Sequence, residues 1–153
     1  MHSLAMMKLT FAAVAALGWL ALADTASACQ CRPTRGLTAV QVLADADVLF
    51  TGTAIKSVAG KTGERSSYAV TNFRVTEAFK GAKAGQLIKV GHNSGPTASC
   101  GVQFEIGEPH TLGPTRWKGE LGTGLCTALI FRSDRTGALI GELRALKRRK
   151  QAT

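Results

Sequence analysis

Two cysteines at a spacing of two, Cys29 and Cys31, are the residues of this sequence best placed to do chemistry. They directly follow Ala26-Ser27-Ala28, whose small side chains match the pattern that signal peptidase cuts. Cleavage after Ala28 makes Cys29 the first residue of the mature chain. An amine, a carbonyl and a cysteine side chain then lie together at the new end, which we take as the candidate functional site.

The segment before Cys29 has the parts of an export signal. Lys8 gives it a positive flank, and residues 9–23 form an apolar run shorter than the roughly 20 residues of a membrane-spanning helix. Three methionines could start the chain: Met1, Met6 or Met7. We predict a signal peptide over 1–28 and one domain over 29–153, secreted or periplasmic, with no transmembrane segment in the mature chain.

A cysteine after a cleavage site also occurs in lipoproteins, in which the thiol is alkylated and the amine is acylated. Two observations favour the soluble form here. Ala26 stands three residues before Cys29, where lipoprotein signals carry a leucine-like residue. Lipidation of Cys29 would also leave an odd number of cysteines in an oxidising compartment. Anchoring at Cys29 is therefore the less favoured alternative.

The sequence has four cysteines, and in an exported chain they predict two disulfides. A Cys29–Cys31 bridge is disfavoured because so short a loop fits the disulfide geometry badly. Each of these cysteines should then pair with Cys100 or Cys126, in either order, and stabilise the fold by about 4 kcal/mol per bridge. The sequence has no C-x-x-C motif and its histidines are scattered. We therefore expect no intrinsic metal and no cofactor.

The chain is strongly basic, with a formal net charge of +9. Removal of residues 1–28 takes away one lysine and one aspartate, so the charge does not change. A helix is predicted within 133–150, with Leu139, Leu143 and Leu146 on one stripe. Its last turn carries four cations, which suit the helix dipole and predict contact with an anionic surface or polysaccharide: Lys147, Arg148, Arg149 and Lys150.

The pattern of the rest of the domain predicts short strands and one further helix. These elements indicate a small closed or partly open barrel. Gly52 lies inside the first strand and predicts a bulge or strong coiling there. The expected helix covers 38–44. The expected strands cover 48–58, 68–79, 86–91, 102–106, 110–112 and 125–131.

Catalytic and nucleic-acid sites have little support in this sequence. His92 and His110 have no serine or carboxylate partner at a recognisable spacing, so we place them in loops or on the surface and expect no enzymatic activity. Trp117 between Arg116 and Lys118 has the composition of a stacking platform on an OB-like barrel. One such cluster in an exported chain does not predict a specific nucleic-acid partner.

The start of the mature chain, Cys29-Gln30-Cys31-Arg32-Pro33, resembles the C-x-C-x-P start of the netrin-like domain, and in particular of the tissue inhibitors of metalloproteinases. The resemblance covers most of the mature chain. It implies an OB-like five-stranded barrel with packed helices and two disulfides, Cys29–Cys100 and Cys31–Cys126. The other matching segments are 47–52 (DVLFTG), 68–81 (YAVTNFRVTEAFKG), Ser99-Cys100-Gly101 and Leu125-Cys126.

The resemblance also implies a function, inhibition of a zinc metalloprotease. A catalytic zinc keeps one coordination position for water, and a terminal amine that is partly neutral at physiological pH can donate a lone pair to it. By the resemblance, Cys29 chelates the zinc through its amine and carbonyl, and Gln30 points into the pocket beyond the metal. The remaining residues of this inhibitory wedge would lie along the cleft or flank it: Cys31, Arg32, Pro33, Ala98 and Ser99.

The sequence departs from that family at two points. Gln30 stands where the animal inhibitors carry a small hydroxyl residue, and their third disulfide in this domain is absent. The alternative is that the two bridges only pin the N-terminus, which is the common use of cysteines in small secreted domains. The chain would then be a non-inhibitory binding or structural module of the cell envelope that acts through its basic surface.

Overall fold

The computed structural model describes residues 29, 31, 36–59, 68–95, 100–129 and 136–152 of the 153-residue chain. The described part is mainly β, with one six-stranded mixed sheet in the order β4-β1-β2-β3-β6-β5. The strands are β1 (Leu49–Ala59), β2 (Tyr68–Lys80), β3 (Leu87–Asn93), β4 (Pro109–Leu112), β5 (Thr115–Trp117) and β6 (Glu120–Thr123). The helices are α2 (Ala39–Asp45), α3 (Leu125–Leu129) and α4 (Thr136–Gln151).

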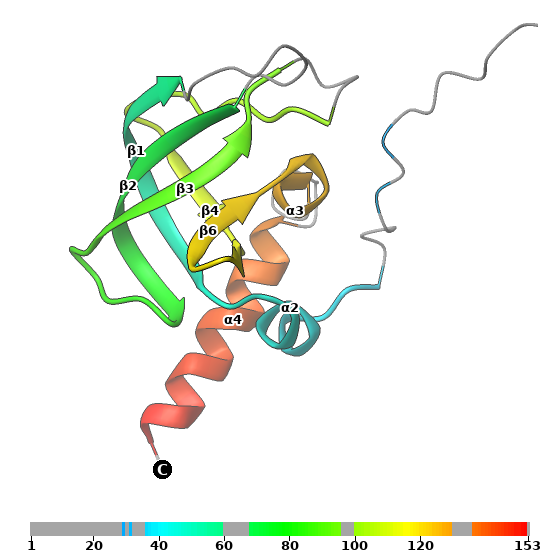
Figure 1. The fold of residues 1–153 in the computed structure, drawn as a ribbon. Coiled ribbons are helices and arrows are strands. Elements are labelled where there is room, and N and C mark those ends of the chain that lie inside the picture. The colour runs from blue at the N-terminus through cyan, green and yellow to red at the C-terminus, as the bar shows by residue number, and fades with distance from the viewer. Residues whose placement is uncertain are drawn as a thin grey trace, which may run out of the picture.

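The two longest strands, β1 and β2, form an antiparallel pair that coils strongly (Figure 1). Its register shifts between Thr51 and Gly52, as the glycine predicted, and at two further points. A Cβ at Gly52 would lie 2.9 Å from the Arg74 carbonyl oxygen and 3.0 Å from the Phe50 ring. Only glycine therefore allows β1 to bend here, where its first half also pairs with β4.

The core lies on one face of this coiled sheet. In β2 the alternate residues Ala69, Thr71, Phe73 and Val75 are buried, while their neighbours are half-buried or exposed. The Phe73 ring meets its aromatic neighbours edge to face, with the ring of Phe104 at a centroid distance of 5.2 Å. Burial of each such ring contributes about 1.5–3 kcal/mol to folding.

A second, smaller core joins α2 to α4. The predicted leucine stripe is confirmed, because Leu139 and Leu143 are buried against α2 and Leu146 packs at its edge. Thr38 caps α2 in a capping box with Gln41. At the other end, the Lys80 ammonium donates to the carbonyl oxygens of Leu43 and Ala46, at 2.7 and 2.6 Å. This lysine therefore joins the end of β2 to the last turn of α2.

The sheet has six strands rather than the five that the resemblance implies, and within the described residues no ladder closes it into a barrel. Its two outermost strands, β4 and β5, are nonetheless consecutive in the chain. They are separated by Gly113 and Pro114, both buried. Proline has no N–H for a ladder, which explains why β4 and β5 are two strands rather than one. The expected strand 110–112 corresponds to β4. A connection of two residues is short, so the end of β4 and the start of β5 lie close together.

Two expected strands are wrong. Residues 102–106 alternate, with Val102 and Phe104 buried, but they join no ladder and end in a turn at Ile106 and Gly107. The expected strand 125–131 is the helix α3 over its described part, while 130 and 131 lie outside the described residues. A short apolar run does not distinguish a buried strand from a buried helix. In α3 the Thr127 hydroxyl accepts from Gly124 N–H, one of the donors that a helix start leaves without a partner in the helix.

Within the described ranges, no helix has both the length and the apolar character needed to cross a membrane.

Candidate functional site

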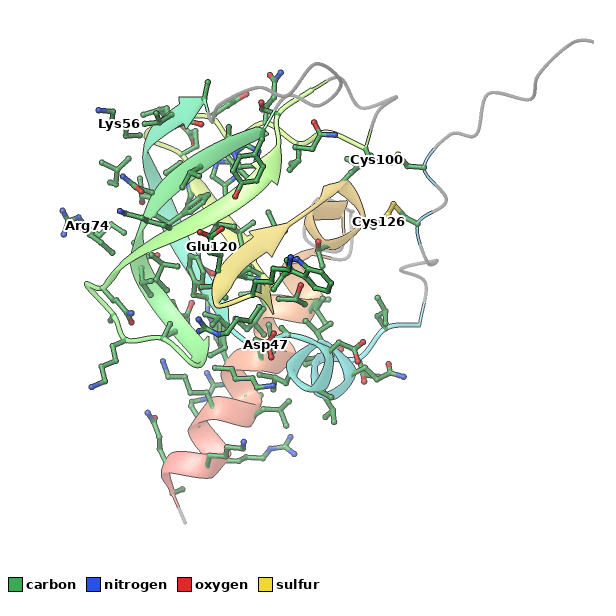
Figure 2. All side chains as sticks on the ribbon, viewed as in Figure 1. Asp47, Lys56, Arg74, Cys100, Glu120 and Cys126 are labelled. Atoms are coloured by element: carbon green, nitrogen blue, oxygen red, sulfur yellow. A yellow bond between two sulfur atoms is a disulfide. The ribbon has the colours of Figure 1, made fainter. Side chains whose placement is uncertain are left out.

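Two disulfides fasten the candidate site to the domain. They join Cys29 to Cys100 and Cys31 to Cys126, with Cα–Cα distances of 5.6 and 4.9 Å. This is the pairing that the resemblance implies, and within the described residues no cysteine is left free. Figure 2 shows Cys100 and Cys126 on the same side of the domain.

The sheet topology explains how cysteines so close in sequence reach such distant partners. β3 and β6 are parallel and pair through Gly91–Gly122 and His92–Thr123. Parallel strands leave a sheet at the same end, so the segment after β3 and the helix after β6 lie near each other. Cys100 follows β3 and Cys126 follows β6. The Cα atoms of Cys29 and Cys31 can be at most about 7 Å apart, and these neighbouring exits fit that span.

The segment that carries Cys100 is held by tight backbone contacts. Val102 N–H donates to the Asn93 carbonyl at 2.7 Å, and Gly95 N–H donates to the Asn93 side chain at 2.9 Å. Cys100 itself has a positive φ of 61°, which is uncommon for a residue other than glycine. A Cβ on the next residue, Gly101, would overlap the backbone of Gly95. Glycine is therefore required at position 101 by this geometry.

His92 contacts this segment through a hydrogen bond to Val102. Its expected place in a loop or on the surface is wrong. It lies in β3 and is only 3% exposed, because it continues the buried alternation of Ile88 and Val90. Its Nδ1 lies 2.9 Å from the Val102 carbonyl oxygen, and its Nε2 lies 2.8 Å from the Thr71 hydroxyl. A carbonyl only accepts, so Nδ1 carries a proton and donates it to Val102, while Nε2 and the Thr71 hydroxyl form the second hydrogen bond.

Burial lowers the pKa of His92 from its ordinary value of 6.5, although the hydrogen bond to the Val102 carbonyl acts in the opposite direction. The ring also packs edge to face on Phe104 at a centroid distance of 4.9 Å. His110, the other histidine of the domain, is half-buried in β4 and meets the same Phe104 ring. Both histidines are therefore part of the aromatic core.

The helix α3 presents Cys126. Leu125 is buried, and the Thr127 hydroxyl accepts from Gly124 N–H at 3.1 Å, which satisfies a donor at the start of the helix. Cys126 is exposed on the first turn. Its bridge to Cys31 is thus on the outside of the domain.

The structure describes only part of the predicted wedge. It places Cys29 and Cys31, and both are half-buried. The other predicted contact residues lie outside the described residues: Gln30, Arg32, Pro33, Ala98 and Ser99. Within the described residues, no group of three or more histidine, cysteine or acidic side chains is arranged to hold a metal ion.

The basic residues predicted to meet an anionic surface lie at the end of α4. Arg148, Arg149 and Lys150 are exposed, and Lys147 is half-buried. One turn earlier, the Arg144 guanidinium binds both oxygens of Glu77, the closest at 2.8 Å. This pair ties α4 to β2 and holds the pKa of the Glu77 carboxyl below its usual value. Figure 1 shows the last turns of α4 extending beyond the sheet.

Sequence reasoning missed a cleft of about 680 Å³ at the opposite ends of β3 and β6. Leu87, Ile88 and Lys89 form one side, and the β5–β6 hairpin forms the other with Arg116, Glu120 and Leu121. The cleft continues over the outer face of β1 and β2 at Val58 and Tyr68. The exposure of Tyr68 and Leu87 follows from the strand alternation, which is the signal that could have indicated this site. Val58 lies in the run 55–59, which is exposed throughout.

Trp117, the predicted stacking residue, is 75% exposed on β5 beside the cleft. Arg116 next to it donates from Nη1 to the Gly119 carbonyl oxygen at 3.0 Å, which fixes the guanidinium across the hairpin turn.

No protein-family model matches this chain, and no curated protein matches it either.

Proposed function

We propose that this chain is an exported, netrin-like domain that inhibits zinc metalloendopeptidases through its mature N-terminus. The observation that carries the proposal is the interleaved pairing Cys29–Cys100 and Cys31–Cys126. It holds two residues at the start of the mature chain on two separate elements. A terminus fixed in this way loses little conformational entropy when it docks, which favours tight binding.

The order of the strands supports the family assignment. If β4 and β5 are counted as one strand interrupted at Gly113-Pro114, the sheet has five strands, and its two edges come from that single strand. An OB-like barrel is the closed form of this arrangement. We propose that the domain is such a barrel, opened at the β4–β5 interruption.

The chemistry is chelation of the protease's zinc by a main-chain end. Removal of residues 1–28 releases the amine of Cys29, and the amine and carbonyl of the same residue can form a five-membered chelate. The pair would displace the water from the open position of a catalytic zinc. Gln30 would enter the pocket beyond the metal, with Arg32 and Pro33 along the cleft and Ala98 and Ser99 on its other side. The domain itself performs no reaction in this scheme.

Correctly processed protein that begins at Cys29 tests the proposal against a panel of zinc proteases. A variant with one extra alanine before Cys29 keeps both disulfides, but the nitrogen of Cys29 becomes part of a peptide bond and is no longer a free amine. We expect its inhibition constant to rise by at least about 100-fold, equivalent to roughly 3 kcal/mol. Equal inhibition by both forms, or no inhibition by the processed form, would contradict the proposal. Mass spectrometry of the mature chain should show an unmodified Cys29.

The second candidate is a cell-envelope module that binds an anionic surface or polysaccharide. It is favoured by the three exposed cations at the end of α4, Arg148, Arg149 and Lys150, on turns that extend beyond the sheet. Replacement of these residues by glutamine would then weaken binding to anionic vesicles or acidic polysaccharide and leave protease inhibition unchanged. The extra alanine before Cys29 would have the opposite pattern of effects.

A further inference from the structure

The strand β3 is incompletely paired along the edge that faces β6. β3 begins at Leu87 and pairs with β2 along its whole length, whereas its ladder to β6 contains only Gly91 and His92. β6 begins at Glu120, but neither Glu120 nor Leu121 pairs with β3. The first half of β3 therefore separates from β6, and the cleft lies between them.

The backbone groups that face the cleft follow from the alternation of an antiparallel ladder. Val75 N–H donates to the Gln86 carbonyl at 2.9 Å, which makes these two facing residues a hydrogen-bonded pair. Every second facing pair of an antiparallel ladder is hydrogen-bonded, so Phe73–Ile88 and Thr71–Val90 are also hydrogen-bonded pairs. The N–H and C=O groups of Leu87 and Lys89 consequently point away from β2. Within the described residues, β6 offers these groups no ladder partner.

The side chains around this edge are apolar with a surplus of positive charge. Val58, Tyr68 and Leu87 are 48%, 40% and 58% exposed and line the same cleft. A Cβ on Gly91 would overlap the Tyr68 hydroxyl, so the Tyr68 ring covers the strand where its pairing with β6 begins. The charged side chains in the lining are two cations, Lys89 and Arg116, and one anion, Glu120. Lys89 has no hydrogen bond or ion pair to any described residue.

We infer that this cleft binds an extended peptide segment by strand addition to β3, with apolar side chains and an acidic residue. The backbone of the segment pairs with the free groups of Leu87 and Lys89, and its apolar side chains cover Tyr68 and Leu87. The acidic residue meets Lys89 and Arg116. A lysine on an edge strand opposes pairing with other strands in general, so Lys89 makes the edge selective for an acidic partner. The cleft volume falls in the usual range for binding sites.

The test uses three blocked pentapeptides and the ¹⁵N-labelled protein with both disulfides formed. The probe is acetyl-Val-Glu-Val-Thr-Val-amide, and the second peptide carries lysine in place of glutamate. The third is the probe with N-methyl groups on the amides of one edge. We expect the probe to shift the amide signals of Leu87, Lys89 and Leu121 and to slow hydrogen exchange at Leu87 and Lys89. The other two peptides should bind at least about tenfold more weakly.

Charge reversal at two matched lysines sharpens the test. Lys89→Glu should lower affinity for the probe by about tenfold and raise affinity for the lysine peptide. Lys56→Glu is the control, because Lys56 is exposed on β1 and does not line the cleft; Figure 2 shows it away from Glu120. It should change either affinity by less than about twofold.

Three results would overturn the inference: equal binding of the N-methylated peptide, signal shifts confined to other residues, or self-association of the protein through this edge in place of peptide binding. The inference does not depend on the proposed function. The variant with an extra alanine before Cys29 should bind the probe as the unchanged protein does.

Discussion

At their carboxyl ends β3 and β6 pair through Gly91–Gly122 and His92–Thr123, and the segments that follow them carry Cys100 and Cys126. At their amino ends the same strands separate around a cleft lined by Leu87, Lys89 and Leu121. One end is crowded with backbone contacts, a buried histidine and two bridges. The other leaves apolar side chains exposed. Tight packing and an open apolar surface are thus placed at opposite ends of one strand pair.

The largest effect should come from removal of a bridge at the paired end. The double replacement Cys31→Ser and Cys126→Ser opens a loop with a sequence separation of 95. The free energy of unfolding should fall by about 4 kcal/mol in urea titrations, because the unfolded chain regains the entropy that the bridge removed. Leu87→Ser at the open end is the matched comparison and should cost less than about 0.5 kcal/mol. Similar losses for both variants would contradict the contrast between the ends.

A smaller loss is expected from Gly101→Ala, because its new Cβ would overlap the backbone of Gly95. The segment would have to move, at a cost of about 2 kcal/mol or more in thermal or urea unfolding. Gly122→Ala is the control at the same end of the sheet, since its Cβ would meet only the Gly91 carbonyl oxygen at 3.8 Å. If Gly122→Ala proved the more damaging change, the described packing around Cys100 would be wrong.

The smallest effect should be a dependence of stability on pH that comes from His92. Its folded pKa is lowered, so between pH 6.5 and that lower value the unfolded chain binds more protons than the folded one. Stability should therefore decrease as the pH falls below about 6.5 and level off below the folded pKa, with each pKa unit worth about 1.4 kcal/mol. Unfolding curves at several pH values measure this slope. His92→Gln should flatten it, and an unchanged slope in that variant would assign the dependence to other groups.

The sequence predicted those parts of the fold that depend on local pattern. The first three strands were expected at 48–58, 68–79 and 86–91 and lie close to those ranges, and the helices α2 and α4 were expected at 38–44 and within 133–150. The disulfide pairing followed only from the family resemblance, since spacing alone left two connectivities open.

Features that depend on distant partners could not be predicted in the same way. Residues 102–106 have the alternation of a strand but no neighbour to pair with, and Cys126 lies in an apolar run that fits a helix equally well. The separation of β3 from β6 depends on where the β5–β6 hairpin begins. The residues around Leu87 give no indication of that position. The burial of His92 could have been predicted from the sequence, because His92 continues the two-residue period of Ile88 and Val90.

The order of the cysteines along the chain has a consequence for biogenesis. The ribosome synthesises Cys29 and Cys31 long before Cys100 and Cys126. In the folded domain, cysteines that follow each other in the sequence are not bonded to each other. Oxidation in order of appearance would join Cys29 to Cys31 and Cys100 to Cys126. The native pairing instead requires the Cys29 thiol to stay reduced until Cys100 has emerged and the Cys31 thiol until Cys126 has emerged, or an isomerase to exchange the bonds afterwards.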